Sequence, residues 1–198
     1  MYWYEEDVKQ LEKKGQSLNF APETLFYGSS SIRLWSSLDK DFPNFKPVNL
    51  GFGGSTLAAC VWFFERIMKP YQPKRLVIYA GDNDLGDGRH PEEVFIFFQE
   101  LAVKINARFG NIPVYFISLK PSITRWHMAN IFRFTNTLIE GEIKTYAANW
   151  HFVDVFNPML DAAGKPRPEL FAFDGLHLSA KGYALWRAII LNCILHMG

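Results

Sequence analysis

Cysteine is scarce in this chain, and no long apolar run is present. Only Cys60 and Cys193 occur among the 198 residues, far apart and each in an apolar helical context. With no CxxC motif and no disulfide framework, we expect two buried free thiols in a reducing, cytoplasmic compartment. The N-terminus lacks the apolar core of a secretory leader, and a leader removed from a longer precursor is the alternative. Since no run approaches the ~20 apolar residues that cross a bilayer, we expect no membrane span.

An excess of either charge is also missing. Lys and Arg number 21, Asp and Glu number 20, and the formal net charge is +1. This balance gives no electrostatic basis for binding nucleic acid or an anionic membrane surface.

Several motifs of cofactor and metal enzymes are absent. The chain has no P-loop, and Thr56 stands where a dinucleotide fingerprint needs its third glycine. The GxSxG motif is missing because Leu57 occupies its final glycine position. The acidic run Asp82–Asp84 lacks the later ligand and the glycine of a calcium loop, and the five histidines lack a zinc spacing such as HExxH. We therefore expect neither a metal nor a cofactor.

What the sequence does contain is an alternation of strand and helix patterns. Apolar residues make up 48% of the chain and aromatic residues 16%, which is typical of one globular domain, residues 1–198, with a bulky core. Strand-like runs cover residues 24–28, 46–50, 76–80, 112–118 and 151–155. Helical patterns cover 3–14, 31–42, 57–68, 91–109, 126–150 and 180–196, with a linker that ends at residue 22. This order predicts a three-layer, doubly wound α/β fold, with five parallel strands in the flavodoxin-like order 2-1-3-4-5.

Special residues fall where the predicted strands end. Ser29–Ser31 follow the first strand, Gly51–Ser55 the second and Gly81–Asp84 the third, while Asp174 and His177 precede the last helix. The carboxyl ends of parallel strands share one edge of the sheet, so we expect these groups to converge. Together they supply a hydroxyl, backbone amides, a side-chain amide, a histidine and a carboxylate, which are the groups that acyl transfer needs. Taken singly, each has a plainer explanation, such as a helix cap, a tight turn or a surface ion pair.

At these positions the sequence resembles the GDSL/SGNH hydrolases, a superfamily of esterases and lipases. Its four blocks, centred on Ser, Gly, Asn and His, occur in order between about Thr24 and Ala184. They are Gly28-Ser29-Ser30, the glycine-rich stretch Asn49–Thr56, Gly81-Asp82-Asn83-Asp84 as GxND, and Asp174-Gly175-Leu176-His177 as DxxH. Each block alone is short, but the ordered set is specific.

The resemblance implies a serine esterase that works through an acyl-enzyme without a cofactor. It implies Ser30 as the nucleophile, His177 as the base and Asp174 as the carboxylate that orients His177. It also implies an oxyanion hole made by the backbone amides of Ser30 and Gly54 and the side chain of Asn83.

The identity of the nucleophile depends on this resemblance. The residue pattern alone leaves Ser29, Ser30 and Ser31 open, and the family register selects Ser30. Ser29 is a departure from the family, which has an aspartate at that position, so a carboxylate is missing beside the site.

The substrate is expected to be a small carboxylic ester. Loop 120–128 and segment 166–173 flank the predicted site, and they offer contacts for an acyl chain or a sugar ring, or alternatively packing residues: Arg125, Trp126, Phe171 and Phe173. No long apolar groove is visible in the sequence, so we expect a short-acyl or O-acetyl ester, as for a carbohydrate acetylesterase.

Other functions stay open at this level. The resemblance also allows a lysophospholipase or an acyl-thioesterase. Two alternatives of another class are a catalytically silent flavodoxin-like binding domain and a mononucleotide binder. The second leaves Asp174 and His177 without a role.

Overall fold

Five parallel strands form the centre of the protein in a computed structural model that describes residues 1–146 and 149–197. The strands are β1 (Thr24–Gly28), β2 (Pro47–Gly51), β3 (Arg75–Tyr79), β4 (Val114–Ile117) and β5 (Trp150–Val153). Their order in the sheet is β2-β1-β3-β4-β5, which confirms the predicted flavodoxin-like order. Parallel strands of this kind are buried on both faces, which explains the continuous apolar run Leu76–Ala80 at the centre of the sheet.

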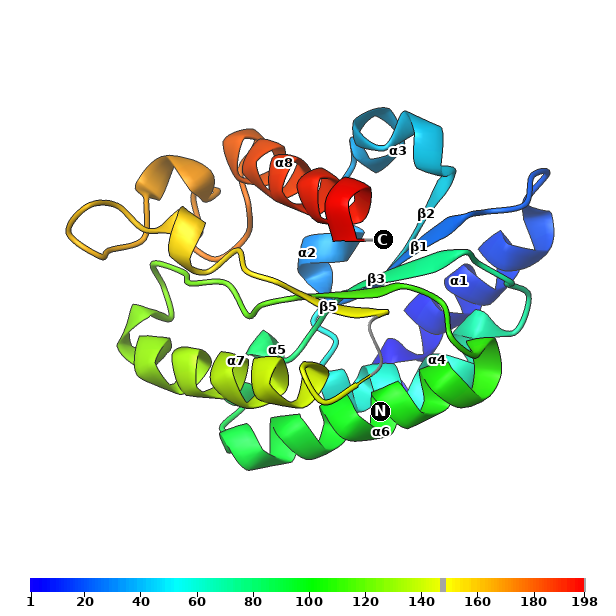
Figure 1. Ribbon diagram of the computed structural model, residues 1–198, viewed down its shortest axis with the longest axis horizontal. Coiled ribbons are helices and arrows are strands. Elements are labelled where there is room, and N and C mark those ends of the chain that lie inside the picture. The colour runs from blue at the N-terminus through cyan, green and yellow to red at the C-terminus, as the bar shows by residue number, and fades with distance from the viewer. Residues whose placement is uncertain (147–148, 198) are drawn as a thin grey trace.

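Helices cover both faces of the sheet (Figure 1). One face carries α1 (Glu5–Ser17), α4 (Leu57–Met68), α6 (Pro91–Phe109) and α7 (Ala129–Ile143). The other carries α2 (Ser30–Arg33), α3 (Leu38–Asp41) and the C-terminal α8 (Ala180–Met197). Alternate strand residues supply the two halves of the core, so that Leu25 and Ile78 belong to one cluster and Phe26 and Val77 to the other.

The helix predicted over residues 31–42 is divided into two short helices. α2 ends at Arg33, α3 begins at Leu38, and the 3-10 turn η2 (Pro43–Phe45) follows. Asp41 Oδ2 accepts hydrogen bonds from Trp35 Nε1 at 2.7 Å and from the Ser37 hydroxyl at 2.6 Å. Such local side-chain bonds compete with a continuous helix, and the buried Trp35 is packed against Phe26 and Phe42.

Other boundaries also differ from the sequence-based expectation. The helix predicted over 126–150 is the turn η3 (Trp126–Met128) followed by α7, and residues 147–148 of that span lie outside the described residues. A short helix, α5 (Asp82–Gly86), forms where a polar turn was expected. The segment before α8 is irregular apart from the turns η4 (Asn157–Met159) and η5 (Pro168–Leu170). At the N-terminus, the turn η1 (Tyr2–Tyr4) precedes α1.

Both cysteines are free, although only one is fully buried. Cys60 lies in the core, whereas Cys193 on α8 is half-buried, so the expectation of two buried thiols was wrong for the second. Within the described residues, no helix combines the length and apolar character needed to cross a membrane.

Candidate active site

The predicted nucleophile lies in the tight turn that joins β1 to α2. Gly28 has φ +142°, and a side chain there would collide with the Tyr79 carbonyl oxygen, 1.9 Å from an added Cβ. Only glycine fits this close approach of two strands. Ser29 then donates its N–H to the same Tyr79 oxygen at 2.9 Å, and Ser30 opens α2. The turn therefore presents Ser30 at the carboxyl edge of the sheet.

The structure brings Ser30, His177 and Asp174 into one hydrogen-bonded chain. The Ser30 hydroxyl lies 3.0 Å from His177 Nε2, across 147 residues of sequence. His177 Nδ1 lies 2.6 Å from Asp174 Oδ2. The pKa of Asp174 is lowered to about 2, most of all by the hydrogen bond from His177 and next by the one from the Leu176 amide. A charged Asp174 holds the proton on Nδ1, which leaves Nε2 as an acceptor toward the Ser30 hydroxyl.

The DxxH turn that carries Asp174 and His177 is braced from within and from a neighbouring loop. Asp174 Oδ1 accepts the backbone N–H groups of Leu176 and His177, each at 2.9 Å. The Asp174 carbonyl accepts the Thr124 hydroxyl at 2.6 Å. Lys120 Nζ donates to the Leu176 carbonyl at 2.7 Å. These bonds orient the imidazole although the side chain of Asp174 is half exposed.

The predicted oxyanion donors come from two further loops at this edge. Asn83 Nδ2 donates to the Ser55 carbonyl at 3.1 Å. Arg125 donates from both Nη1 and Nη2 to Asn83 Oδ1, each at 3.1 Å, which defines the orientation of the amide. Gly54 is exposed and has φ +65°, a left-handed conformation that favours glycine. In the described residues nothing lies within 4 Å of a Cβ built on Gly54, so the space beside it is open.

Asp84 joins the loop of Asn83 to the glycine-rich loop. Its carboxylate is fully buried and accepts the backbone N–H groups of Leu57 and Ala58 at the start of α4. Arg89 pairs with it at 2.8 Å. Burial raises the pKa of Asp84 above its usual value, although the two amides and Arg89 oppose that effect. Asp84 thus holds the two loops at a defined separation.

The four side chains expected to contact the substrate have different environments. Phe171 is 6% exposed and packs in the core, whereas Phe173 is fully exposed. The half-buried Trp126 ring is covered by Arg133 and Lys165, whose cationic groups lie 5.4 and 5.5 Å from its centroid. Arg125 is directed to Asn83 and the Asp82 carbonyl. The structure therefore brings Arg125 to Asn83, the predicted oxyanion donor, and places Phe171 in the core.

Arg125 and Lys120 hold parts of the site together through hydrogen bonds that the sequence pattern does not predict. The pattern offers Arg125 as a substrate contact and gives Lys120 no role. Lys120 does follow β4 at the same edge of the sheet as the other special residues, which is a signal that could have identified it.

We expect Arg125→Met to lower kcat about 10-fold with little change in KM, because an unbraced Asn83 amide can rotate away from the developing negative charge. Steady-state kinetics of both proteins, at a temperature below both melting transitions, tests this. Arg133→Met is the control, since Arg133 stacks on Trp126 nearby and has no hydrogen bond to Asn83. A kcat for Arg125→Met equal to that of Arg133→Met would contradict the assignment.

The buried Lys120 leads to a second prediction, which concerns the pH dependence of folding stability. Its side chain is 1% exposed, and burial lowers its pKa from 10.5 to about 8, with Asp82 and Asp174 acting in the opposite direction. Between these two pH values the unfolded chain binds a proton that the folded chain has released, so folding stability rises with pH. Relative to Lys120→Met, the wild type is expected to gain about 3 kcal/mol over that interval.

Urea unfolding of the wild type and Lys120→Met between pH 7 and 10.5 measures this difference. Lys181→Met, at an exposed position on α8, is the matched control and is expected to follow the wild type. Parallel stability curves for the wild type and Lys120→Met would show that the Lys120 pKa is not lowered.

Comparison with known proteins gives one family match and a set of similar structures. Residues 25–185 match the GDSL-like Lipase/Acylhydrolase family. No curated protein sequence matches the chain. A candidate platelet activating factor of Streptococcus pneumonia has a TM-score of 0.84 and 20% identity, over 96% of this chain and 91% of that one.

Two other similar structures are esterase-related. A GDSL-like lipase of Bacteroides thetaiotaomicron has a TM-score of 0.79 and 22% identity, over 95% of this chain and 97% of that one. A carbohydrate esterase of family 3 from Talaromyces cellulolyticus has a TM-score of 0.72 and 15% identity, over 88% and 96%. At these identities the structural matches establish a shared fold and nothing finer.

Proposed function

The chain belongs to the GDSL-like lipase/acylhydrolase family and is a hydrolytic enzyme of the esterase type, and we propose that it hydrolyses short-acyl or O-acetyl carboxylic esters through an acyl-enzyme on Ser30. The observation that carries the proposal is the continuous chain from Ser30 Oγ to His177 Nε2, at 3.0 Å, and from His177 Nδ1 to Asp174 Oδ2, at 2.6 Å. A nucleophile, a base and an orienting carboxylate within hydrogen-bond reach are what acyl transfer requires.

In the first half-reaction, His177 Nε2 takes the proton of the Ser30 hydroxyl while Oγ attacks the ester carbonyl carbon. Asp174 stabilises the imidazolium and keeps the other proton on Nδ1. The tetrahedral oxyanion receives hydrogen bonds from the backbone N–H groups of Ser30 and Gly54 and from Asn83 Nδ2. His177 then returns its proton to the alkoxide as the C–O bond breaks, and the alcohol leaves.

The second half-reaction is hydrolysis of the Ser30 ester. His177 removes a proton from a water molecule, whose oxygen attacks the acyl carbon, and the same three donors hold the second oxyanion. Collapse of this intermediate transfers the proton back to Ser30 Oγ and releases the carboxylic acid. No step needs a cofactor.

The environment of the flanking aromatic residues supports a short acyl group. Of the three aromatic side chains expected at the substrate, Phe171 is in the core, Trp126 is covered by the cationic groups of Arg133 and Lys165, and Phe173 is fully exposed. These three therefore do not form a continuous apolar wall for a long acyl chain. One of the similar structures is a carbohydrate esterase, which is in line with the proposal that this chain acts on an esterified sugar.

A chain-length series of p-nitrophenyl esters, with an acetylated sugar alongside, tests the substrate class. We expect kcat/KM for the acetyl and butyryl esters to exceed that for the lauroyl ester at least ~10-fold, since long chains lack a site to bury their methylene groups. Hydrolysis of long-chain esters or acyl thioesters alone would instead favour a lysophospholipase or thioesterase.

A silent binding domain on the same fold is the alternative of another class. Covalent labelling of Ser30 by a fluorophosphonate probe, located by peptide mass spectrometry, would exclude it, because labelling needs an activated hydroxyl. Absence of both labelling and turnover would favour it, and flavin absorbance in the purified protein would indicate a mononucleotide binder.

A further inference from the structure

We propose that Tyr4 and Asp7, in the segment before the first strand, are positioning residues for the oxyanion donor Gly54. The inference rests on the proposed function and deepens it. This segment, η1 and α1, lies outside residues 25–185, which carry the family match. None of the four sequence blocks that indicate the active site includes a residue of this segment, so they do not predict a role for it.

Tyr4 and Asp7 each form a hydrogen bond to the backbone next to the peptide unit whose N–H would bind the oxyanion. The N–H of Gly54 belongs to the peptide between Gly53 and Gly54. On one side of that peptide, the Gly53 N–H donates to Asp7 Oδ2 at 3.0 Å. On the other side, the Gly54 carbonyl accepts the Tyr4 hydroxyl at 2.9 Å. With both neighbouring peptides held, the direction of the Gly54 N–H is determined as well.

The rest of the glycine-rich loop is bonded to the sheet instead. The Phe52 N–H and the Ser55 hydroxyl both donate to the Gly28 carbonyl, at 3.0 and 3.1 Å. Gly53 and Gly54 form a turn that is closed by a long bond of 3.4 Å from the Ser55 N–H to the Phe52 carbonyl, and their own N–H and carbonyl groups are bonded to Asp7 and Tyr4. Two consecutive glycines have the largest backbone freedom of any pair, so a pair left without bonds would sample many conformations.

Tyr4 is itself held in place by the loop that it braces. Its ring is 5% exposed and meets Phe52 edge-on at 5.5 Å between centroids, and Phe63 of α4 at 6.3 Å. Edge-to-face contacts of this kind limit rotation of the ring. The hydroxyl is thereby directed at the Gly54 carbonyl.

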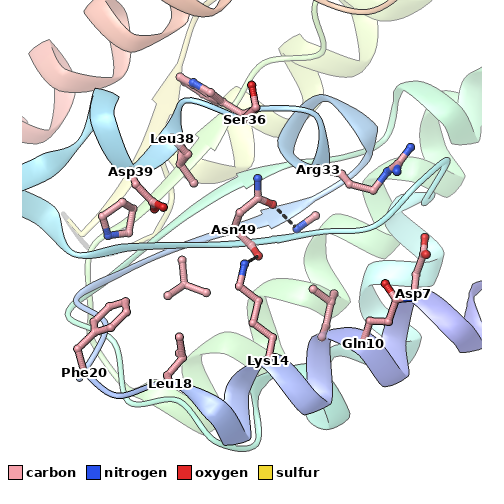
Figure 2. Close-up of a pocket in the computed structure, with 15 residues that line it drawn as sticks. Asp7, Gln10, Lys14, Leu18, Phe20, Arg33, Ser36, Leu38, Asp39 and Asn49 are labelled. Carbon is pink, nitrogen blue, oxygen red and sulfur yellow. Dashed lines mark hydrogen bonds between the residues drawn. The ribbon is translucent and has the colours of Figure 1, made fainter.

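α1 is docked firmly enough to act as such a support. Arg66 of α4 donates to both oxygens of Glu5 and to both oxygens of Glu12, between 2.8 and 3.0 Å. Val8 and Leu11 of α1 are buried in the core. At its other end, Lys14 donates to the Asn49 carbonyl at 2.9 Å, across a groove of about 640 Å³ between α1 and β2 (Figure 2).

The experiment compares Tyr4→Phe and Asp7→Ala with matched controls from the same segment. Tyr4→Phe removes the hydroxyl alone, and Tyr2→Phe does the same at a residue that is 90% exposed. Asp7→Ala removes a first-turn acid that accepts the Gly53 N–H, and Glu6→Ala removes its neighbour, which forms an exposed ion pair with Lys9. Asp7→Asn is the conservative variant, because its amide oxygen can accept the same hydrogen bond.

We expect Tyr4→Phe and Asp7→Ala each to lower kcat about 3- to 10-fold with KM nearly unchanged, below the ~10²–10³-fold loss of a whole oxyanion donor. Hydrogen exchange of the Gly53 amide should accelerate about 10-fold or more in both. Tyr2→Phe, Glu6→Ala and Asp7→Asn should match the wild type in both measurements.

The outcomes separate this inference from the proposed function. Unchanged kcat or unchanged Gly53 exchange in Tyr4→Phe and Asp7→Ala overturns the positioning role, as does an equal loss in the two controls or in Asp7→Asn. Ester turnover that survives Ser30→Ala overturns the proposed nucleophile, and with it the purpose of the Gly54 donor. Because the exchange rate is read without turnover, the two failures give different results.

Discussion

Ser30→Ala is expected to lower kcat for ester hydrolysis by about 10⁴-fold or more, approaching the ~10⁶-fold loss known for a serine protease nucleophile. The Ser30 hydroxyl is the one that meets His177 Nε2, at 3.0 Å. Without this hydroxyl no acyl-enzyme can form. Water must then attack the ester directly, assisted only by substrate binding and by the oxyanion donors. Steady-state rates with p-nitrophenyl acetate and loss of fluorophosphonate labelling both measure this.

The neighbouring serines are matched controls for that result. Ser29 and Ser31 are 0% and 2% exposed, and neither hydroxyl has a bond to His177. The Ser29 hydroxyl has no hydrogen-bond partner among the described side chains and backbone groups, so Ser29→Ala should leave the stability unchanged or slightly higher. We expect both alanine variants to retain labelling and turnover within a few-fold. If Ser30→Ala stays active while either of them fails, Ser30 is not the nucleophile.

Asp174→Asn is expected to lower kcat about 10⁴-fold because it selects the wrong tautomer of His177. Asp174 Oδ1 accepts two backbone N–H groups, so an asparagine must place its oxygen there. Its Nδ2 then faces His177 Nδ1, at the position where Asp174 Oδ2 lies at 2.6 Å. Nδ1 has to become the acceptor, which puts the proton on Nε2 and prevents it from accepting the proton of Ser30.

Asp161→Asn provides a matched control for this substitution. Asp161 also uses Oδ1 to accept two backbone N–H groups, from Ala163 and Lys165, and among the described residues it has no hydrogen bond to a histidine. We expect Asp161→Asn to retain wild-type kcat. The pKa of Asp174 is about 2, so the wild-type carboxylate stays charged throughout a pH 5 to 9 profile and does not limit it. An active Asp174→Asn enzyme would show that the orienting carboxylate is dispensable.

Secondary structure could be predicted correctly where it depends on the residues of one short segment alone. The central strand could be predicted because Leu76–Ala80 is apolar without interruption, as a strand covered on both faces must be, and the other strands are short, mostly apolar segments between turn-forming residues. The helix over residues 31–42 could not, because it is interrupted by bonds from Trp35 and Ser37 to Asp41 that depend on how Trp35 packs. Predicted helix ends shifted for the same reason, since they depend on neighbours elsewhere in the chain.

Periodicity and short ordered motifs are properties of neighbouring residues, and they were enough to predict the fold class and the family correctly; the strand order followed from the usual topology of such folds. The sequence also singled out Ser30, Asp174 and His177 as candidates. Which serine hydroxyl faces His177 is a property of the tertiary structure, because 147 residues separate the two groups and the turn at Gly28 sets the direction of Ser30. The tertiary structure alone directed Arg125 to Asn83 and brought Tyr4 to Gly54, because a hydrogen bond between distant segments depends on where their backbones meet.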